Sequence, residues 1–130
     1  MKKKENKNYF FYFIGLAVVV LIAYLLWQSN NKPGQYDEFS KCLAESGTKM
    51  YGAWWCSHCN NQKEQFGNSW KLFADPGGYI ECSTSERQQT EICRQAGIKG
   101  YPTWRFPDGS ELSGEVDFYT ISKKSDCALI

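Results

Sequence analysis

The feature that most constrains this chain of 130 residues is an apolar segment close to its amino terminus. Residues 9–27, YFFYFIGLAVVVLIAYLLW, are 19 consecutive uncharged positions. A helix of that length spans roughly the 30 Å hydrocarbon core of a bilayer. Aromatic residues crowd both ends of the segment, as rings that prefer the headgroup level do. We therefore expect one N-terminal transmembrane helix over Tyr9–Trp27.

The flanks of the apolar segment predict its orientation. Residues 1–8 are rich in lysine, and positively charged flanks stay in the cytoplasm. This predicts a cytoplasmic basic tail over residues 1–8 and an extracytoplasmic location for everything after the segment. The alternative is a cleaved signal peptide, whose apolar region is usually about 7 to 15 residues long and ends at a small-x-small site. Here the run is longer and ends in LLW, which favours a retained anchor.

The rest of the chain predicts a linker and one domain. Residues 28–35, QSNNKPGQ, are polar and contain Pro33 and Gly34, which indicates a short linker outside any core. Residues 36–130 are enough for a single domain. The formal net charge is +1, and no basic stripe lies outside the N-terminal lysines. Composition therefore indicates no nucleic-acid partner.

All six cysteines lie after the apolar segment. An even number in a small exported domain indicates disulfides, which persist where no cytosolic reductant reaches them. Cys82 closes a strand candidate and Cys93 lies in the next helix candidate, so we expect a local structural bridge between them. A second structural bridge would then join Cys42 to Cys127. The alternative is that one of these pairs relays electrons to or from the remaining two cysteines.

From residue 36 onward, helical and strand patterns alternate. Pro107, Asp108 and Gly109 form a hairpin signal, and Ser83 with Glu86 resembles a helix capping box. We expect helices over residues 37–45, 56–75, 83–96 and 118–124, and strands over residues 48–54, 79–82, 103–106 and 110–113. This order predicts an α/β domain with a small mixed sheet flanked by helices.

The cysteines of the motif Cys56-Ser-His-Cys59 stand where an apolar run gives way to a polar helical one. A structural zinc site needs about four ligands, and this motif offers three, with no second CxxC or further histidine in the sequence. A c-type haem site would need histidine where Asn60 stands. A disulfide across so short a loop restrains the unfolded chain little, so a purely structural role is not favoured. We therefore expect redox chemistry that uses the disulfide itself, with no metal and no other cofactor.

The expected helix start assigns a role to each residue of the motif. Cys56 would lie in the first turn, where unpaired N–H groups and the helix dipole stabilise a thiolate. His58 can add positive charge or a hydrogen-bond donor and so tune that thiolate, or it can simply be a solvated side chain. Cys59, one turn later, is placed to resolve a mixed disulfide.

The segment YGAWWCSHC, followed by YIEC and then by CRQAGIKGYPTW at residues 93–104, resembles the thioredoxin superfamily. More narrowly, it is similar to the thioredoxin-like domain found fused to, or working with, bacterial and archaeal homologues of vitamin K epoxide reductase. The likeness covers roughly residues 39–114. It implies a thioredoxin-like fold and a thiol:disulfide oxidoreductase that forms or isomerises disulfides in exported proteins. It also implies a separate, quinone-linked membrane partner of the vitamin K epoxide reductase type.

The same resemblance implies a substrate-binding element. In that superfamily a cis-proline lies against the active disulfide and helps to hold the substrate backbone. Pro102, directly after Tyr101, matches that position. An ordinary trans proline at a strand start is the alternative.

Two positions depart from the pattern of reducing thioredoxins. These commonly carry Gly-Pro between the cysteines and a buried acid six residues before the first one, whereas Ser57-His58 and Met50 stand here. Histidine before the second cysteine resembles DsbA-like oxidants. The alternative functions are a reductase of exported proteins, such as apocytochrome c, and a non-catalytic anchored binding module or chaperone.

Aromatic residues gather around the motif in the sequence. Tyr51, Trp54, Trp55 and Trp104 could form an apolar surface beside the disulfide that accepts unfolded chains. Packing within the core is the alternative for each of them.

Overall fold

The computed structural model describes residues 7–30 and 32–129. The chain forms two compact units, and the boundary between them in the sequence falls between Lys32 and Pro33. Most of the predicted cytoplasmic tail, residues 1–6, lies outside the described residues.

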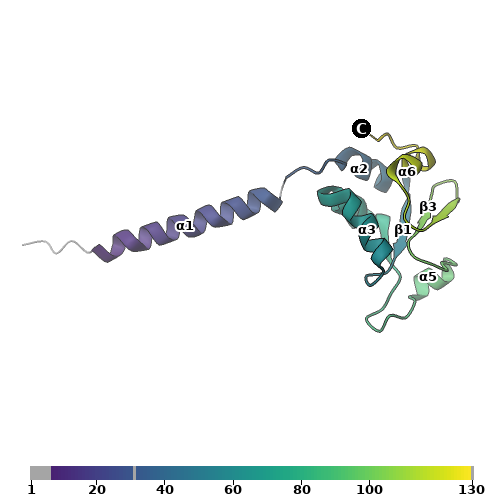
Figure 1. Cartoon of the computed structure of the whole chain (residues 1–130), viewed down its shortest axis with the longest axis horizontal. Coiled ribbons are helices and arrows are strands. Elements are labelled where there is room, and N and C mark those ends of the chain that lie inside the picture. The colour runs from purple at the N-terminus through teal and green to yellow at the C-terminus, as the bar shows by residue number, and fades with distance from the viewer. Residues whose placement is uncertain (1–6, 31, 130) are drawn as a thin grey trace, which may run out of the picture. The chain divides into compact units, whose positions relative to one another are not determined.

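The first unit is the helix α1 (Lys7–Asn30) (Figure 1). Its stretch Tyr9–Ser29 is long and apolar enough to cross a membrane, judged by length and composition. None of the most apolar part of this stretch is buried inside the structure. The predicted membrane span ends at Trp27, whereas the helix itself continues through the polar residues that follow and ends at Asn30.

The second unit begins before the predicted domain start at residue 36. The Gly34 N–H donates to Asp37 Oδ1 at 3.0 Å, and the Tyr36 N–H donates to Ser69 Oγ at 3.0 Å. A Cβ at Gly34 would lie 2.0 Å from Ser69 Oγ, so no side chain fits there. Within residues 28–35, the range predicted as a linker, α1 continues to Asn30 and Gly34 contacts the domain.

The second unit is a mixed α/β domain, with the predicted order of helix, strand, helix, strand, helix, hairpin and helix. A 3₁₀ turn, η1 (Gly67–Ser69), and a π-helical turn, η2 (Ala74–Gly78), lie on either side of α4. The elements in chain order are α2 (Asp37–Ser46), β1 (Lys49–Gly52), α3 (Ser57–Phe66), α4 (Trp70–Phe73), β2 (Tyr79–Glu81), α5 (Glu91–Gln95), β3 (Thr103–Arg105), β4 (Glu111–Ser113) and α6 (Phe118–Ser125).

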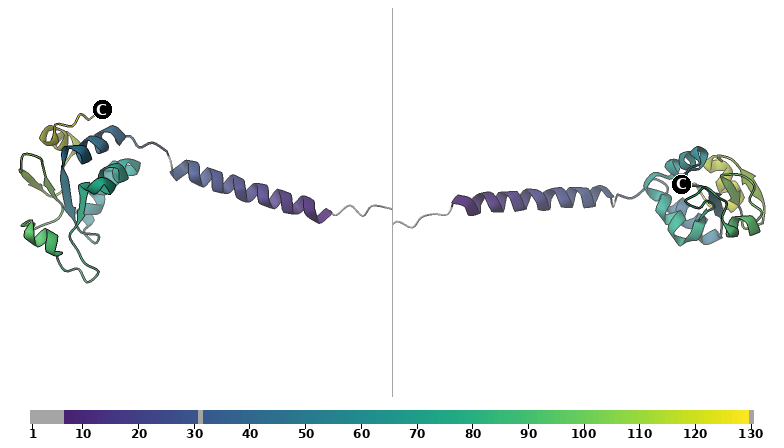
Figure 2. Two further views of the ribbon diagram at one scale, coloured as in Figure 1. Left: turned by 180° about the vertical axis from the view of Figure 1, so that it is seen from behind. Right: turned by 90° about the horizontal axis from the view of Figure 1, so that it is seen from below.

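The four strands form one sheet in the order β2-β1-β3-β4. Strands β1 and β2 are parallel, whereas β3 pairs antiparallel with both β1 and β4. In the parallel ladder Met50 lies opposite Tyr79 and Gly52 lies opposite Glu81. Figures 1 and 2 show the β3–β4 hairpin on the side of β1 away from α3.

Each face of the sheet has its own core, because successive side chains of a strand point to opposite faces. Met50 belongs to a large cluster with Trp104 of β3 and buried residues of α2, α3, α4 and α6, including Phe39 and Phe66. Tyr51 belongs to a smaller cluster with residues around α5. Figure 1 shows α5 apart from α2, α3 and α6. The large cluster supports the helix that carries the CxxC motif.

Helix α5 is shorter than the sequence predicted. It begins at Glu91, with Thr90 as N-cap, rather than at Ser83. Ser83 instead forms an isolated antiparallel bridge with Gln89. Arg87 adopts a left-handed backbone conformation (φ 62°), which closes the intervening turn and cannot continue a helix. The predicted capping box is therefore wrong, and the segment between β2 and α5 is a loop.

Two disulfides are present in the domain. Cys42 of α2 is joined to Cys127, which follows α6, and the two Cα atoms are 5.7 Å apart. Cys82, at the end of β2, is joined to Cys93 of α5 with a Cα separation of 5.5 Å. These are the same two pairs that the sequence led us to expect.

Candidate active site

The CxxC motif lies at the junction between β1 and α3. Cys56 is the N-cap of α3, with extended backbone angles (φ −80°, ψ 117°), and its sulfur accepts a hydrogen bond from the Cys59 N–H at 3.3 Å. Cys56 is 8% exposed and Cys59 is fully buried. Both are free thiols in this structure. The N-cap position places the Cys56 sulfur at the amino-terminal end of α3, where it accepts from a backbone N–H of the first helical turn.

The loop before β3 lies against Cys56. The Cys56 thiol donates to the carbonyl oxygen of Tyr101 at 3.6 Å. The Tyr101–Pro102 peptide bond is cis, and the Pro102 carbonyl accepts a hydrogen bond from the Gly114 N–H at 2.8 Å. The Tyr101 ring packs edge-on against Trp55, with centroids 6.1 Å apart. The structure therefore brings Trp55, Tyr101 and Pro102 together beside the sulfur.

Of the four aromatic residues proposed for a surface beside the motif, two are exposed and two are not. Trp54 is 47% exposed and Trp55 is 41% exposed. The indole N–H groups of both donate to the loop after β2, to the Thr84 carbonyl and the Ser83 hydroxyl respectively. Trp104 is fully buried, and the Tyr51 side chain lies in the core on the other face of the sheet. The interpretation of those two as surface residues is wrong, because both belong to the core.

His58 makes a contact that the sequence did not predict. Its Nδ1 lies 2.6 Å from Glu115 Oε1, and the Asn61 amide donates to the same oxygen at 3.1 Å. The hydrogen bond from His58, followed by that from Asn61, holds the pKa of Glu115 below its usual range. His58 thus lies in the first turn of α3, as expected, but it contacts a carboxylate that sequence analysis missed.

Glu115 reaches His58 because a buried glutamine holds the neighbouring backbone. Gln62 is fully buried, and its side-chain oxygen accepts hydrogen bonds from the Val116 N–H at 2.7 Å and the Trp104 indole at 3.3 Å. Its amide donates to the Val116 carbonyl at 3.0 Å. These contacts fix the segment after β4 along α3. No local sequence signal links residues that are so far apart in the chain.

Around Cys59 lies a second group of residues that the sequence analysis did not single out. Burial, and then the hydrogen bond with Cys56, raise the pKa of the Cys59 thiol to about 12. The nearby Lys63 of α3 acts in the opposite direction. The Lys63 Nζ lies 4.0 Å from the centroid of the Tyr79 ring, and the Tyr79 hydroxyl donates to Glu81 Oε2 at 2.7 Å. Cys59 is therefore buried near Lys63 and Tyr79, and Tyr79 is in turn hydrogen-bonded to Glu81.

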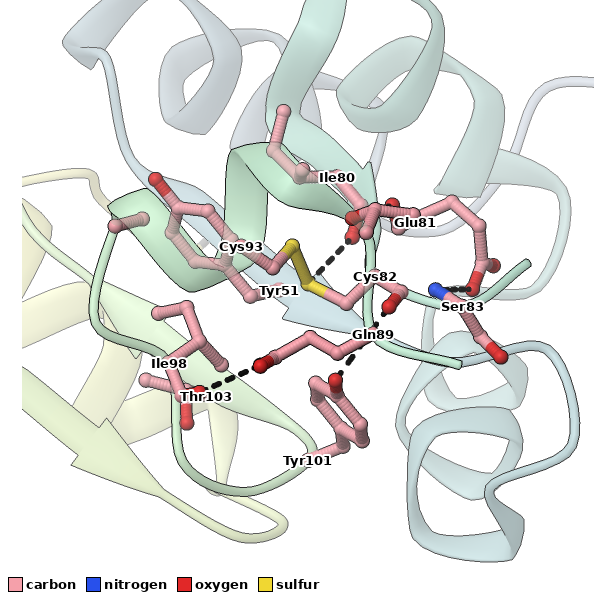
Figure 3. Close-up of a disulfide and its surroundings, with 12 residues drawn as sticks. Tyr51, Ile80, Glu81, Cys82, Ser83, Gln89, Cys93, Ile98, Tyr101 and Thr103 are labelled. Atoms are coloured by element: carbon pink, nitrogen blue, oxygen red, sulfur yellow. Dashed lines mark hydrogen bonds between the residues drawn. A yellow bond between two sulfur atoms is a disulfide. The ribbon is translucent and has the colours of Figure 1, made fainter. Parts of the chain in front are cut away.

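The Cys82–Cys93 disulfide has different surroundings, which Figure 3 shows. Both cysteines are fully buried, and Tyr51 and Ile98 are the other buried residues of their cluster. The Tyr101 hydroxyl lies 3.5 Å from the Cys82 carbonyl oxygen, to which it donates. Tyr101 therefore contacts the strand end that carries this disulfide as well as Cys56.

The described side chains offer no cluster of metal ligands. Across residues 7–30 and 32–129, no group of three or more His, Cys, Asp or Glu side chains could hold a metal ion. Cys56, Cys59 and His58 do not form such a group, since His58 is directed to Glu115.

Comparison with known proteins gives a relative of similar sequence. The chain is similar to an Arabidopsis thaliana protein named thiol-disulfide oxidoreductase LTO1, with 39% identity over 94 residues. These residues make up 69% of this chain and 24% of the relative. The chain thus spans about a quarter of the length of that relative. No protein-family model matches the chain.

Proposed function

We propose that this chain is a membrane-anchored thiol:disulfide oxidoreductase whose domain acts outside the cytoplasm to form or isomerise disulfides in exported proteins. The observation that carries the proposal is the position of Cys56. It is the N-cap of α3 and is 8% exposed, while Cys59 lies fully buried one turn later. This arrangement separates a nucleophile that can meet a substrate from a resolving thiol that cannot.

In the oxidising direction, a substrate thiolate attacks the Cys56 sulfur of the Cys56–Cys59 disulfide. A substrate–Cys56 bond forms, the Cys56–Cys59 bond breaks, and Cys59 leaves with the electron pair. A second substrate thiolate then attacks the first substrate sulfur and releases Cys56. The substrate gains a disulfide, and the enzyme is left as a dithiol.

Three residues are proposed to hold the substrate during this exchange. Trp55 offers an exposed ring, the Tyr101 carbonyl accepts from the Cys56 thiol, and Pro102 directly follows Tyr101. We assign to Pro102 the placement of the substrate backbone by resemblance to the thioredoxin superfamily. The sheet order β2-β1-β3-β4 with flanking helices is compatible with a thioredoxin-like fold. His58, bound to Glu115, is proposed to tune the thiolate from the first helical turn.

The anchor and the redox partner complete the proposal. The helix over Tyr9–Ser29 would hold the domain at the membrane, with the basic tail in the cytoplasm. Each turnover leaves Cys56 and Cys59 reduced, so an oxidant must restore the disulfide. A quinone-linked membrane oxidoreductase of the vitamin K epoxide reductase type would supply it as a separate protein. The relative's name, a thiol-disulfide oxidoreductase, supports the reaction class.

An experiment distinguishes the proposed oxidase from a reductase of exported proteins. The full chain, in detergent micelles with its disulfide formed, is mixed with a reduced, unfolded substrate protein that needs disulfides. We expect the substrate to acquire disulfides while Cys56 and Cys59 become alkylatable. If the substrate is left reduced, and instead only the reduced chain acts by cleaving substrate disulfides, the chain is a reductase.

A double variant controls for binding without chemistry. Cys56→Ser with Cys59→Ser removes both sulfurs and keeps the surrounding surface. We expect this variant to be inactive in oxidation. If it still prevents aggregation of the unfolded substrate as well as the wild type does, and the wild type forms no disulfides, the chain is a binding module or chaperone.

A further inference from the structure

The proposed chemistry requires a proton to move at a buried sulfur. Cys59 must be a thiolate to attack, and it departs as a thiolate when a substrate opens the disulfide. It is fully buried, so bulk water does not reach the sulfur. Burial raises the pKa of this thiol to about 12, which leaves it almost entirely protonated at neutral pH. A neighbouring group must therefore exchange the proton.

The parallel pairing of β1 with β2 brings two candidates for this proton exchange, Tyr79 and Glu81, toward Cys59. Tyr79 and Glu81 are two residues apart on β2, so their side chains leave the same face of the sheet. Tyr79 packs against the core cluster that contains Cys59. A Cβ built on Gly52 would lie 3.2 Å from Cys59 Sγ and 3.2 Å from Tyr79 Oη. The sulfur and the phenol therefore line the same small space above Gly52.

The phenol is already hydrogen-bonded to a carboxylate. The Tyr79 hydroxyl donates to Glu81 Oε2 at 2.7 Å. The other oxygen, Glu81 Oε1, accepts hydrogen bonds from the Trp54 N–H at 3.2 Å and the Ser83 N–H at 3.0 Å. Glu81 is partly exposed, so it connects this buried chain of groups to solvent. A phenol that gives its proton to Glu81 can take one from a thiol.

Lys63 supplies the charge that a Cys59 thiolate needs. It lies one turn after Cys59 in α3, and its ammonium rests 4.0 Å from the Tyr79 ring centroid. Burial lowers the pKa of Lys63, whereas the negative charge of Glu81 acts against that shift. Cys56, the partner sulfur, raises the pKa of Cys59, and a hydrogen bond with the Ala53 backbone lowers it. Met50, opposite Tyr79 in the ladder, has no titratable group.

We propose that Tyr79 and Glu81 form a proton relay for Cys59, and that Lys63 stabilises its thiolate. The inference rests on the proposed function. In resolution, the Cys59 proton passes to Tyr79 Oη while the phenolic proton passes to Glu81. The Cys59 thiolate then forms the bond to Cys56, and the Cys56–substrate bond breaks. The substrate leaves as a thiolate and is protonated by water. In the oxidising direction the relay returns the proton to Cys59.

One reaction tests the relay and reports both cysteines. The reduced full chain in detergent micelles is mixed rapidly with a symmetric chromogenic aromatic disulfide. Attack by Cys56 releases the first equivalent of coloured thiol, and resolution by Cys59 releases the second. We expect Tyr79→Phe to slow the second phase by about 10²-fold at pH 7, at the lower end of general acid–base effects, and to leave the first phase unchanged.

The pH dependence separates a relay from a structural effect. In Tyr79→Phe the second phase should rise tenfold for each pH unit, because hydroxide then removes the proton, whereas the wild type should depend on pH less steeply. Glu81→Gln is the second variant, since its amide oxygen still accepts the Trp54 and Ser83 N–H groups. Tyr51→Phe is the matched control, because the Tyr51 hydroxyl accepts from Arg105 on the other face of the sheet.

Each outcome decides a different claim. Wild-type second phases in both Tyr79→Phe and Glu81→Gln at every pH would overturn the relay and leave the proposed function standing. A wild-type chain that releases neither equivalent would overturn the proposed function, and the relay with it. A second phase slowed equally by Tyr51→Phe would also overturn the relay, because that hydroxyl is remote from Cys59.

Discussion

Two cysteine pairs of this domain are held on opposite faces of the sheet, and their surroundings differ in kind. Cys56 and Cys59 lie at the start of α3, with a carboxylate, a phenol and a lysine around the buried sulfur. Cys82 and Cys93 are both fully buried in a small cluster with Tyr51 and Ile98. Of these two pairs, only the first has a residue that is not fully buried, Cys56 at 8% exposed, and a charged side chain, Lys63, that acts on the other sulfur.

The difference in surroundings favours reaction at the first pair and a structural role for the second. A thiolate is stabilised by N–H donors or a nearby cation, and the first pair has the Cys59 N–H at Cys56 and Lys63 near Cys59. A disulfide in an apolar core lacks that stabilisation on reduction, and substrate cannot approach it. Cysteine spacing alone does not make the distinction. Position at a helix start and the titratable neighbours do.

The largest expected effect comes from removing Cys56, the proposed nucleophile. Cys56→Ser should lower disulfide formation in a reduced substrate by about 10³-fold or more, since it removes a group that acts as a unit with Cys59. Thermal stability should change little. Turnover is measured by alkylation of the substrate thiols. The control is Cys59→Ser, which should accumulate a mixed disulfide through Cys56, and full activity of Cys56→Ser would contradict the assignment.

Replacing the two disulfide-bonded pairs should lower the stability of the domain much more than replacing Cys56 does. On the chain-entropy model, replacing Cys42 and Cys127 by Ser should cost about 4.5 kcal/mol of unfolding free energy, because the bridge closes a loop with a separation of 85 residues. Replacing Cys82 and Cys93 should cost about 3 kcal/mol, since their separation is 11. Urea denaturation measures both. Non-reducing peptide mapping checks the pairing, and any other pairs would contradict it.

Adding one methyl group at Gly52 tests how closely Cys59 and Tyr79 pack there. A Cβ at Gly52 would lie 2.9 Å from Tyr79 Cε2 and 3.2 Å from Cys59 Sγ. We expect Gly52→Ala to destabilise the domain by about 1–3 kcal/mol, as overpacking does, and to slow resolution. Gly100→Ala is the control, because nothing lies within 4 Å of a Cβ there. Equal stability of the two variants in urea would show that the space above Gly52 is larger.

The smallest effect concerns the hydrogen bond between His58, at the start of α3, and Glu115. His58→Ala should raise the pKa of Glu115 toward its usual range, because the His58 hydrogen bond is the main cause of the depression. A depressed carboxyl stabilises the fold above its unfolded pKa, and that contribution is lost as pH falls through the folded pKa, below about pH 4. Carbon-detected NMR of the Glu115 carboxyl measures the titration. An unchanged titration in His58→Ala would mean that Asn61 alone sets it.

Local signals in the sequence predicted much of the fold and the position of the motif. Gly47 ends α2 in a left-handed conformation, and the turn at residues 107–109 joins β3 to β4, as expected from residue type alone. The start of α5 was mispredicted although a local signal was present. Ser83 and Glu86 have capping-box spacing, but the bridge from Ser83 to Gln89 gives the backbone other hydrogen bonds.

The neighbours of the motif could not be predicted, because they depend on long-range pairing. Tyr79 and Glu81 reach Cys59 through the register of β1 with β2. Glu115 reaches His58 because Gln62 anchors Val116. Sequence spacing therefore located the two sulfurs, and tertiary pairing located the groups that would move protons to and from them.

The most direct test of the central claim is to titrate all three cysteine pairs in one experiment. The full chain is equilibrated in micelles across a series of thiol–disulfide redox buffers, quenched, alkylated and mapped by mass spectrometry. We predict that Cys56 and Cys59 interconvert at a potential between about −120 and −270 mV, while the other two pairs stay oxidised to below about −300 mV. A Cys56–Cys59 pair that never forms a disulfide, or three pairs that reduce together, would contradict the account.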